Sequence, residues 1–206
     1  MFEAIVHGFI LALGLILPLG AQNVFIFNQG ANHQSFRMTL PVVITAGLCD
    51  TILITVAVLG ISVILLSFPT LQLVLFIIGL AFLLLYMAWS LWHEKPGNLD
   101  SHRTMGTLKQ ISFAFSVSIL NPHAIMDIVG VIGTSATAYS GFDKVAFTLT
   151  TIVVSWIWFI GLAIAGKTVG RIDTSGKYLV MLNKVSSIII LIVAGIIVKN
   201  IIELIW

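Results

Sequence analysis

Six long apolar stretches, each able to cross a lipid bilayer as a helix, dominate this 206-residue sequence. A helix that crosses about 30 Å of hydrocarbon needs about 20 predominantly apolar residues. Stretches of that kind occupy residues 4–27, 39–66, 71–92, 111–138, 145–166 and 183–206. Lipid offers backbone groups no hydrogen-bond partners, and the runs are continuous, so helices are expected and not the alternating strands of a barrel. The fold class we predict is an all-α integral membrane protein with six transmembrane helices.

The composition supports lipid as the surrounding medium and excludes several functions. Hydrophobic residues make up 59% of the chain and charged residues 9%, whereas soluble domains carry roughly 25% charged residues. The net charge of +2 comes from scattered basic residues, so we expect no nucleic-acid partner. The single cysteine, Cys49, excludes a disulfide framework, a redox pair and a cysteine zinc site. No GxSxG or HExxH motif occurs, so we expect neither an enzyme nor a metal or cofactor site.

The charges in the loops predict how the helices are oriented. Eight of the ten basic residues fall in the first, third and fifth connections, and two, Lys144 and Lys199, fall on the opposite side. The eight are Arg37, Lys95, Arg103, Lys109, Lys167, Arg171, Lys177 and Lys184. Because basic residues accumulate in cytoplasmic loops, both termini should lie outside the cytoplasm.

The polar loop at residues 93–110 divides the chain into two sets of three helices, residues 1–92 and 111–206. Because three is an odd number, homologous halves would lie in the membrane with opposite topology, as an inverted repeat. Pro18 and Pro122 are 104 positions apart, and so are Asn23 and Asp127. Each half therefore opens with a helix that carries a proline and, five residues later, a polar side chain. This correspondence favours a 3+3 inverted repeat.

Both of these opening helices contain residues that interrupt a helix. Pro18 and Gly20 precede two amide side chains in the first, and Pro122 follows Asn121 in the fourth. Proline removes an amide donor and clashes with the carbonyl four residues earlier, so each helix should be kinked or unwound there. Freed carbonyls and half-helix N-termini can then bind a ligand. A single such proline often only bends a helix, but two at matching positions beside amides favour a binding site.

Two carboxylates, Asp50 and Asp127, lie deep in the predicted helices. Asp50 is the twelfth residue of its stretch, about 18 Å from the end, which places it near the bilayer centre. A carboxylate at that depth must be protonated, paired or exposed to a wet cavity. No Lys or Arg lies at matching depth, so a cationic substrate or a proton is the expected partner. The alternative for both is a protonated carboxyl group that hydrogen-bonds between helices.

Other features have both a structural and a functional interpretation. His123, next to Pro122, could relay protons, although a lone histidine is more often a neutral hydrogen-bonding group. Trp156 could lie over a substrate cation, although packing is its ordinary role. Small residues should permit close approach between helices. They recur at Gly8, Ala12, Gly161, Ala165 and Gly166.

The motifs of this sequence resemble those of the LysE/ArgO family of amino-acid exporters. The residues that carry the resemblance are GAQNVFIFNQG at 20–30, Cys49–Asp50 and LNPHAIMD at 120–127. The resemblance covers nearly the whole chain in length, helix count and motif order. It implies export of lysine, arginine or related basic amino acids across the bacterial cytoplasmic membrane, driven by the proton gradient. Ala21, Cys49 and Ile119 depart from the proline, serine and tryptophan that are usual in the family.

We therefore predict an alternating-access exporter whose central site lies between breaks in the first and fourth helices. The family's motif residues carry over to Gln22, Asn23, Asp50, Asn121, Pro122 and Asp127. The two carboxylates would attract the cationic or amino groups of the substrate, and the three amides with a half-helix N-terminus would hold its carboxylate. Protons would compete with substrate at Asp50 and Asp127, with His123 as a candidate relay.

Two alternatives stay open. The chain could export neutral amino acids or other small solutes, or it could be a passive channel or a structural membrane subunit. The lipid bilayer, protons and an amino acid are the expected partners. The sequence leaves open which amino acid is carried and whether the chain forms a homo-oligomer.

Overall fold

The computed structural model describes residues 1–17, 20–33, 35–60, 105–119, 124–125 and 128–172, with single positions between 70 and 84 and between 188 and 202. Within these residues all regular structure is helical and no strand occurs. Among the described helices, two are long and apolar enough to cross a membrane, and a bent pair makes a third if it counts as one span. The predicted spans at 71–92 and 183–206 lie almost wholly outside the described residues.

The first apolar stretch forms two helices, α1 (Phe2–Ile16) and α2 (Ala21–Asn32), whose axes are bent by 79°. The helical ladder of α1 ends at Leu17, whose amide donates to the Leu13 carbonyl. Gly20 has extended dihedrals, φ −76° and ψ 173°, and α2 begins directly after it. The interruption falls where the sequence predicts one. However, α2 continues to Asn32, beyond the predicted boundary at residue 27.

A short 3-10 turn, η1 (Phe36–Met38), leads into α3 (Leu40–Val58). Pro41 lies in the first turn of α3, where a helix has no use for the missing amide hydrogen. The turn after α3 contains Gly60, whose φ of +78° is accessible mainly to glycine.

The longest helix, α8 (Gly141–Ile172), extends beyond the predicted span of 145–166 at both ends. Residues 141–144 and 167–172 were expected to be loop because they are polar or charged, and that expectation is wrong. Asp143 lies in the first turn and Arg171 in the last, where each charge interacts favourably with the helix dipole. Asp143 also forms an ion pair of 2.7 Å with the amino group of Met1.

The second half begins with α6 (Thr107–Ile119) and continues through a π-helical segment, η2 (Ile128–Gly133), and a 3-10 turn, η3 (Ala136–Ala138). The π-helical geometry is not predicted by hydropathy, which is insensitive to whether the hydrogen bonds span four residues or five. Most of the predicted break at residues 121–127 lies outside the described residues.

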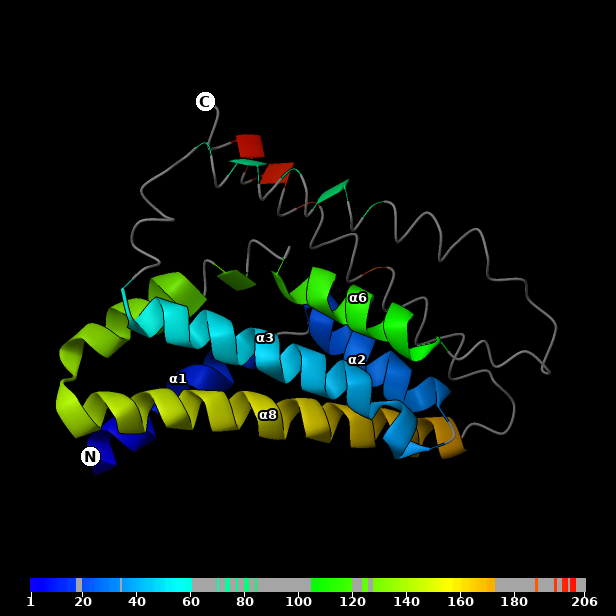
Figure 1. The fold of residues 1–206 in the computed structure, drawn as a ribbon, viewed down its shortest axis with the longest axis horizontal. Coiled ribbons are helices and arrows are strands. Elements are labelled where there is room, and N and C mark those ends of the chain that lie inside the picture. The colour runs from blue at the N-terminus through cyan, green and yellow to red at the C-terminus, as the bar shows by residue number, and fades with distance from the viewer. Residues whose placement is uncertain are drawn as a thin grey trace.

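The helices pack in a reciprocal pattern. Helix α1 packs on α8 and α6 packs on α3, while α2 packs on α8 and η2 packs on α3. Helices α3 and α8 contact each other and lie side by side in Figure 1. One apolar cluster, around Ile54, Ile128 and Phe147, fills the space between α1, α3, η2 and α8. A second, around Ile26, Val42 and Phe159, joins α2, α3, α6 and α8.

Glycines allow the backbones of α2 and α8 to touch. A Cβ atom added to Gly30 would overlap the backbone of Ala163, and one added to Gly166 or Gly170 would overlap the carbonyl of Phe27 or Ala31. The expected role of Gly166 in close packing is confirmed. The same expectation for Gly161 and Ala165 is wrong, because both lie on the exposed face of α8.

Candidate functional site

Asp50 lies in the middle of α3 and is 7% exposed. The Gln22 amide Nε2, on α2, donates to its Oδ1 at 3.4 Å. The buried hydroxyl of Ser155, on α8, is the second hydrogen-bonding neighbour of the carboxylate. Among the described residues no Lys or Arg forms an ion pair with Asp50. Two helices, α2 and α8, therefore bring neutral polar groups to a buried carboxylate on a third, α3.

The break before α2 places a helix N-terminus next to this carboxylate. Gln22 is the second residue of α2, and no side chain caps that end of the helix. The first amide groups of a helix lack intrahelical partners and carry a partial positive charge. The first turn of α2 contains no acidic residue of its own. Tertiary packing therefore brings the carboxyl group of Asp50, on the neighbouring helix, close to this N-terminus.

Asn23 spans the break. Its Nδ2 donates to the carbonyl of Ile16 at 2.8 Å, and Ile16 is the last residue of α1. The carbonyls in the last turn of a helix otherwise lack partners, which is costly in lipid. Asn23 therefore ties the two half-helices together beside Asp50.

Trp156 on α8 covers the side of α3 adjacent to Asp50. The indole Nε1 donates to Thr51 Oγ1 at 3.1 Å, and Thr51 in turn donates to the Gly47 carbonyl at 2.7 Å. A Cβ on Gly47 would lie 2.6 Å from the Trp156 ring, so the ring rests on the glycine. The sequence did not single out Gly47 or Ser155. A usable signal was the spacing of Gly47, Asp50 and Thr51, which places all three on one side of a helix.

Some of the other predicted residues lie within the described part of the chain and some do not. Gly20 is the cap residue of α2. The remaining predicted positions, Pro18, Asn121, Pro122, His123 and Asp127, lie outside the described residues. Of the threonines near Asp50 in sequence, Thr45 and Thr55 donate to the carbonyls of Pro41 and Thr51 in their own helix. Gln22 and Asp50 are thus the two predicted residues seen in contact.

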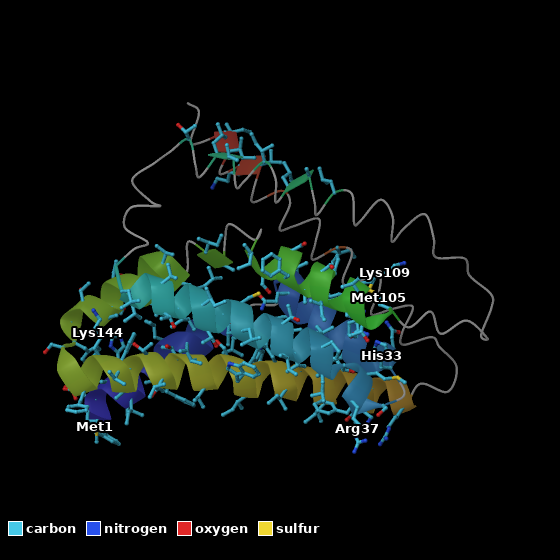
Figure 2. The ribbon with its side chains drawn as sticks, in the orientation of Figure 1. Met1, His33, Arg37, Met105, Lys109 and Lys144 are labelled. Carbon is cyan, nitrogen blue, oxygen red and sulfur yellow. The ribbon has the colours of Figure 1, made fainter. Side chains whose placement is uncertain are left out.

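Charged groups differ between the two ends of the bundle. Figure 2 places Arg37 and Lys109 at one end, together with His33 and Met105. Lys144 and the amino terminus, Met1, lie at the opposite end. The C-terminal turn of α8, which carries Arg171, lies at the same end as Arg37 (Figure 1).

Comparisons with known proteins agree on one class of protein. The profile of the LysE type translocator family matches residues 13–200. The Bacillus subtilis protein named "Putative amino-acid transporter YisU" is 50% identical over 194 residues, which cover 94% of this chain and 88% of the relative. The arginine exporter protein ArgO of Salmonella paratyphi A is 36% identical over 162 residues, covering 77% of this chain and 75% of the relative. No solved structure matches this chain.

Proposed function

This chain belongs to the LysE type translocator family, and from that membership we propose that it exports arginine or lysine by alternating access coupled to the proton gradient. The family consists of membrane amino-acid transporters and not enzymes. Transport from the cytoplasm places the chain in the bacterial inner membrane. The 36% identity to an arginine exporter supports a basic amino acid as the substrate.

The buried carboxylate of Asp50 is the observation that carries this proposal. It is 7% exposed and receives hydrogen bonds from neutral groups only, among the residues described. A carboxylate near the bilayer centre costs a few kcal/mol unless a positive charge or a proton joins it. A guanidinium or ammonium group of the substrate supplies that charge, and a proton replaces it on the return. Competition between the two couples export to proton entry.

The second half of the proposed site comes from the fourth helix. Asn121 and Asp127, on either side of Pro122, would face the substrate as Gln22 and Asp50 do, with His123 beside them as a relay. Asn23 and Asn121 would hold the substrate carboxylate together with Gln22 and the N-terminus of α2. The broken helices at Pro18–Gly20 and Pro122 would supply the backbone groups.

The packing pattern supports an inverted repeat of residues 1–92 and 111–206 around the loop at 93–110. A shift of 104 positions moves residues 2–16 to 106–120, the span of α6 within one residue, and moves Leu40 to Lys144, near the start of α8. Under that correspondence the contact of α1 with α8 is equivalent to that of α6 with α3. The contact of α2 with α8 is likewise equivalent to that of η2 with α3. Thr51 corresponds to Ser155, and these two residues meet the Asp50 site from opposite helices.

The charge distribution supports an orientation with both termini outside the cytoplasm. Arg37, Lys109 and Arg171 lie at one end of the bundle and Lys144 at the other. Positive residues favour the cytoplasmic side. The end with Arg37 and His33 is therefore the proposed cytoplasmic entrance.

The test is counterflow in proteoliposomes that contain the purified protein. Vesicles loaded with unlabelled substrate should accumulate labelled arginine and lysine. The rate of this uptake should saturate with concentration and respond to an imposed pH gradient. Labelled threonine distinguishes the neutral-amino-acid alternative. Flux that neither saturates nor shows competition would indicate a channel, and the absence of any amino-acid flux would reject the proposal.

A further inference from the structure

A second buried polar cluster lies at the end of α2 away from the break. Gln29, His33 and Gln110 are 6%, 4% and 2% exposed. The His33 Nε2 lies 2.9 Å from Gln110 Nε2 and 3.2 Å from Gln29 Oε1. Figure 2 places His33 and Met105 at the end of the bundle that carries Arg37 and Lys109. None of these three polar residues is used in the transport site around Asp50.

One hydrogen-bond partner of His33 favours a particular tautomer. Gln110 Nε2 donates to the backbone carbonyl of Met105 at 2.7 Å, and a carbonyl can only accept. The atom of Gln110 beside His33 is therefore the amide nitrogen, and His33 Nε2 accepts from it when the ring hydrogen lies on Nδ1. In this tautomer the longer contact of Nε2, to Gln29, requires the Gln29 amide to be turned over so that its nitrogen faces the ring.

Among the described residues, two buried polar atoms of this cluster lack a hydrogen-bond partner: His33 Nδ1 and Gln110 Oε1. One is a donor in this tautomer and the other an acceptor. Buried polar groups of native proteins are nearly always paired, so an unpaired donor and acceptor on neighbouring side chains call for a ligand. The two atoms are at most about 7 Å apart, because ring and amide each add only about 2 Å to the 2.9 Å contact.

The chemistry of an amino-acid head group matches this pair. An α-carboxylate accepts hydrogen bonds and an α-ammonium donates them, and with a hydrogen bond of about 2.9 Å on each side the group reaches at most roughly 8 Å. Hydrogen bonds that meet the group at an angle therefore bridge two atoms about 7 Å apart or closer. The cluster also lies on the same side of α2 as the partner of Asp50. Gln22 and Gln29 are seven residues apart on one face of α2, so Gln29 is about 10 Å along the helix from Gln22, and His33 is the C-cap residue of that helix.

We propose that Gln29, His33 and Gln110 form an inner subsite that binds the α-carboxylate and α-ammonium groups of an amino acid entering from the end of α2 before it reaches Asp50. His33 Nδ1 donates to the carboxylate, and Gln110 Oε1 accepts from the ammonium group. This subsite rests on the proposed export of amino acids and adds a recognition step that selects the head group, whereas Asp50 selects the cationic side chain.

The test compares arginine with n-butylguanidine, which has the same guanidinium group and carbon chain but neither the α-carboxylate nor the α-ammonium group. Binding to the purified full-length protein is followed by ligand-induced thermal shift in detergent for wild type, Gln110→Leu, His33→Phe and Asp50→Asn. Ser116→Ala, a partly exposed position on α6 whose hydroxyl donates only within its own helix, is the control. Gln110→Leu and His33→Phe should weaken arginine binding about ten-fold or more, and n-butylguanidine binding should not fall. Asp50→Asn should weaken both compounds.

Parallel loss of arginine and n-butylguanidine in the Gln110 and His33 variants would overturn the subsite, because it would indicate a structural or water-binding cluster. Unchanged arginine affinity in both would overturn it too. The unfolding temperature of each variant is first measured without ligand, so that only folded variants are compared. Because the two substitutions lie in different segments of the chain, the test can still be made if one of the variants fails to fold. A wild-type protein that binds neither arginine nor any other amino acid would instead reject the proposed function.

Discussion

The indole of Trp156 donates a hydrogen bond to Thr51 across 3.1 Å while its ring rests on Gly47, one helical turn before Thr51. This contact joins α8 to α3 beside Asp50, since Ser155, the neighbour of Trp156, reaches the carboxylate itself. The position of the Asp50 site therefore depends on a glycine that leaves room for an aromatic ring.

Gly47→Ala should destabilise the protein and reduce transport. The new Cβ would lie 2.6 Å from the Trp156 ring, so the ring or the helix must shift. Overpacking of this kind costs about 1–3 kcal/mol, more than the roughly 1 kcal/mol that alanine gains in helix propensity. Gly161→Ala on α8 is the matched control, because nothing lies within 4 Å of its Cβ. Thermal unfolding in detergent should separate the two variants, and equal stability would contradict the packing argument.

Asp50→Asn and Asp127→Asn should insert normally and lose transport. An amide keeps the shape of the side chain and is no costlier in lipid. Loss of a charge-assisted bond to a cation weakens binding by about 1.5–3 kcal/mol, or ten- to more than a hundred-fold. The loss should be greater for arginine or lysine than for a neutral amino acid. Wild-type export by both variants at normal protein levels would mean that these carboxylates are structural.

Asn23→Asp should destabilise the break between α1 and α2. The substitution keeps the shape but replaces the donor to the Ile16 carbonyl with an acceptor. An unpaired buried carbonyl costs about 1–3 kcal/mol. The unfolding temperature should therefore fall, whereas Ser116→Ala, at a partly exposed position of α6, should leave it nearly unchanged. A variant as stable as wild type would show that the bond across the break contributes little.

His33 should make stability depend on pH. Burial lowers the pKa of His33 below its ordinary value of 6.5, because the charged ring is disfavoured away from water. The unfolded chain then binds the proton more tightly, so the stabilisation is complete above about pH 6.5 and is lost as the pH falls through the lowered pKa. Unfolding temperatures measured between pH 7.5 and 5 should decline less steeply for His33→Asn than for wild type. Identical slopes would contradict this contribution.

The orientation can be tested by cysteine labelling in intact cells. In a Cys49→Ser background, a cysteine at Ser140 should react rapidly with an impermeant reagent, and a cysteine at Asn98 should be protected until the cells are opened. This follows from the basic residues at the end opposite Lys144. Rapid labelling at position 98 in intact cells would reverse the proposed topology.

The sequence by itself determined the features that depend on local composition. Continuous apolar runs predicted α3 and the interior of α8, and the glycine and proline at 18–20 predicted the interruption that separates α1 from α2. Depth along one helix was enough to identify Asp50 as a residue that lipid should not tolerate. The ends of α8 were missed because a hydropathy pattern places the end of a span at the first charged residue. Asp143 and Arg171 are nevertheless helical, because each charge interacts favourably with the helix dipole at its own end.

Only the tertiary structure decided which polar groups meet. Gln22 reaches Asp50 from 28 positions away, and Gln110 reaches His33 from 77. The Trp156 ring contacts Gly47 only because α3 and α8 pack against each other there. Helical periodicity specifies the face on which a side chain lies, but the partner on that face is set by the angle and closeness of helix packing. That closeness in turn depends on glycines such as Gly30 and Gly166, whose contacts with the opposing backbone exist only once the helices are assembled.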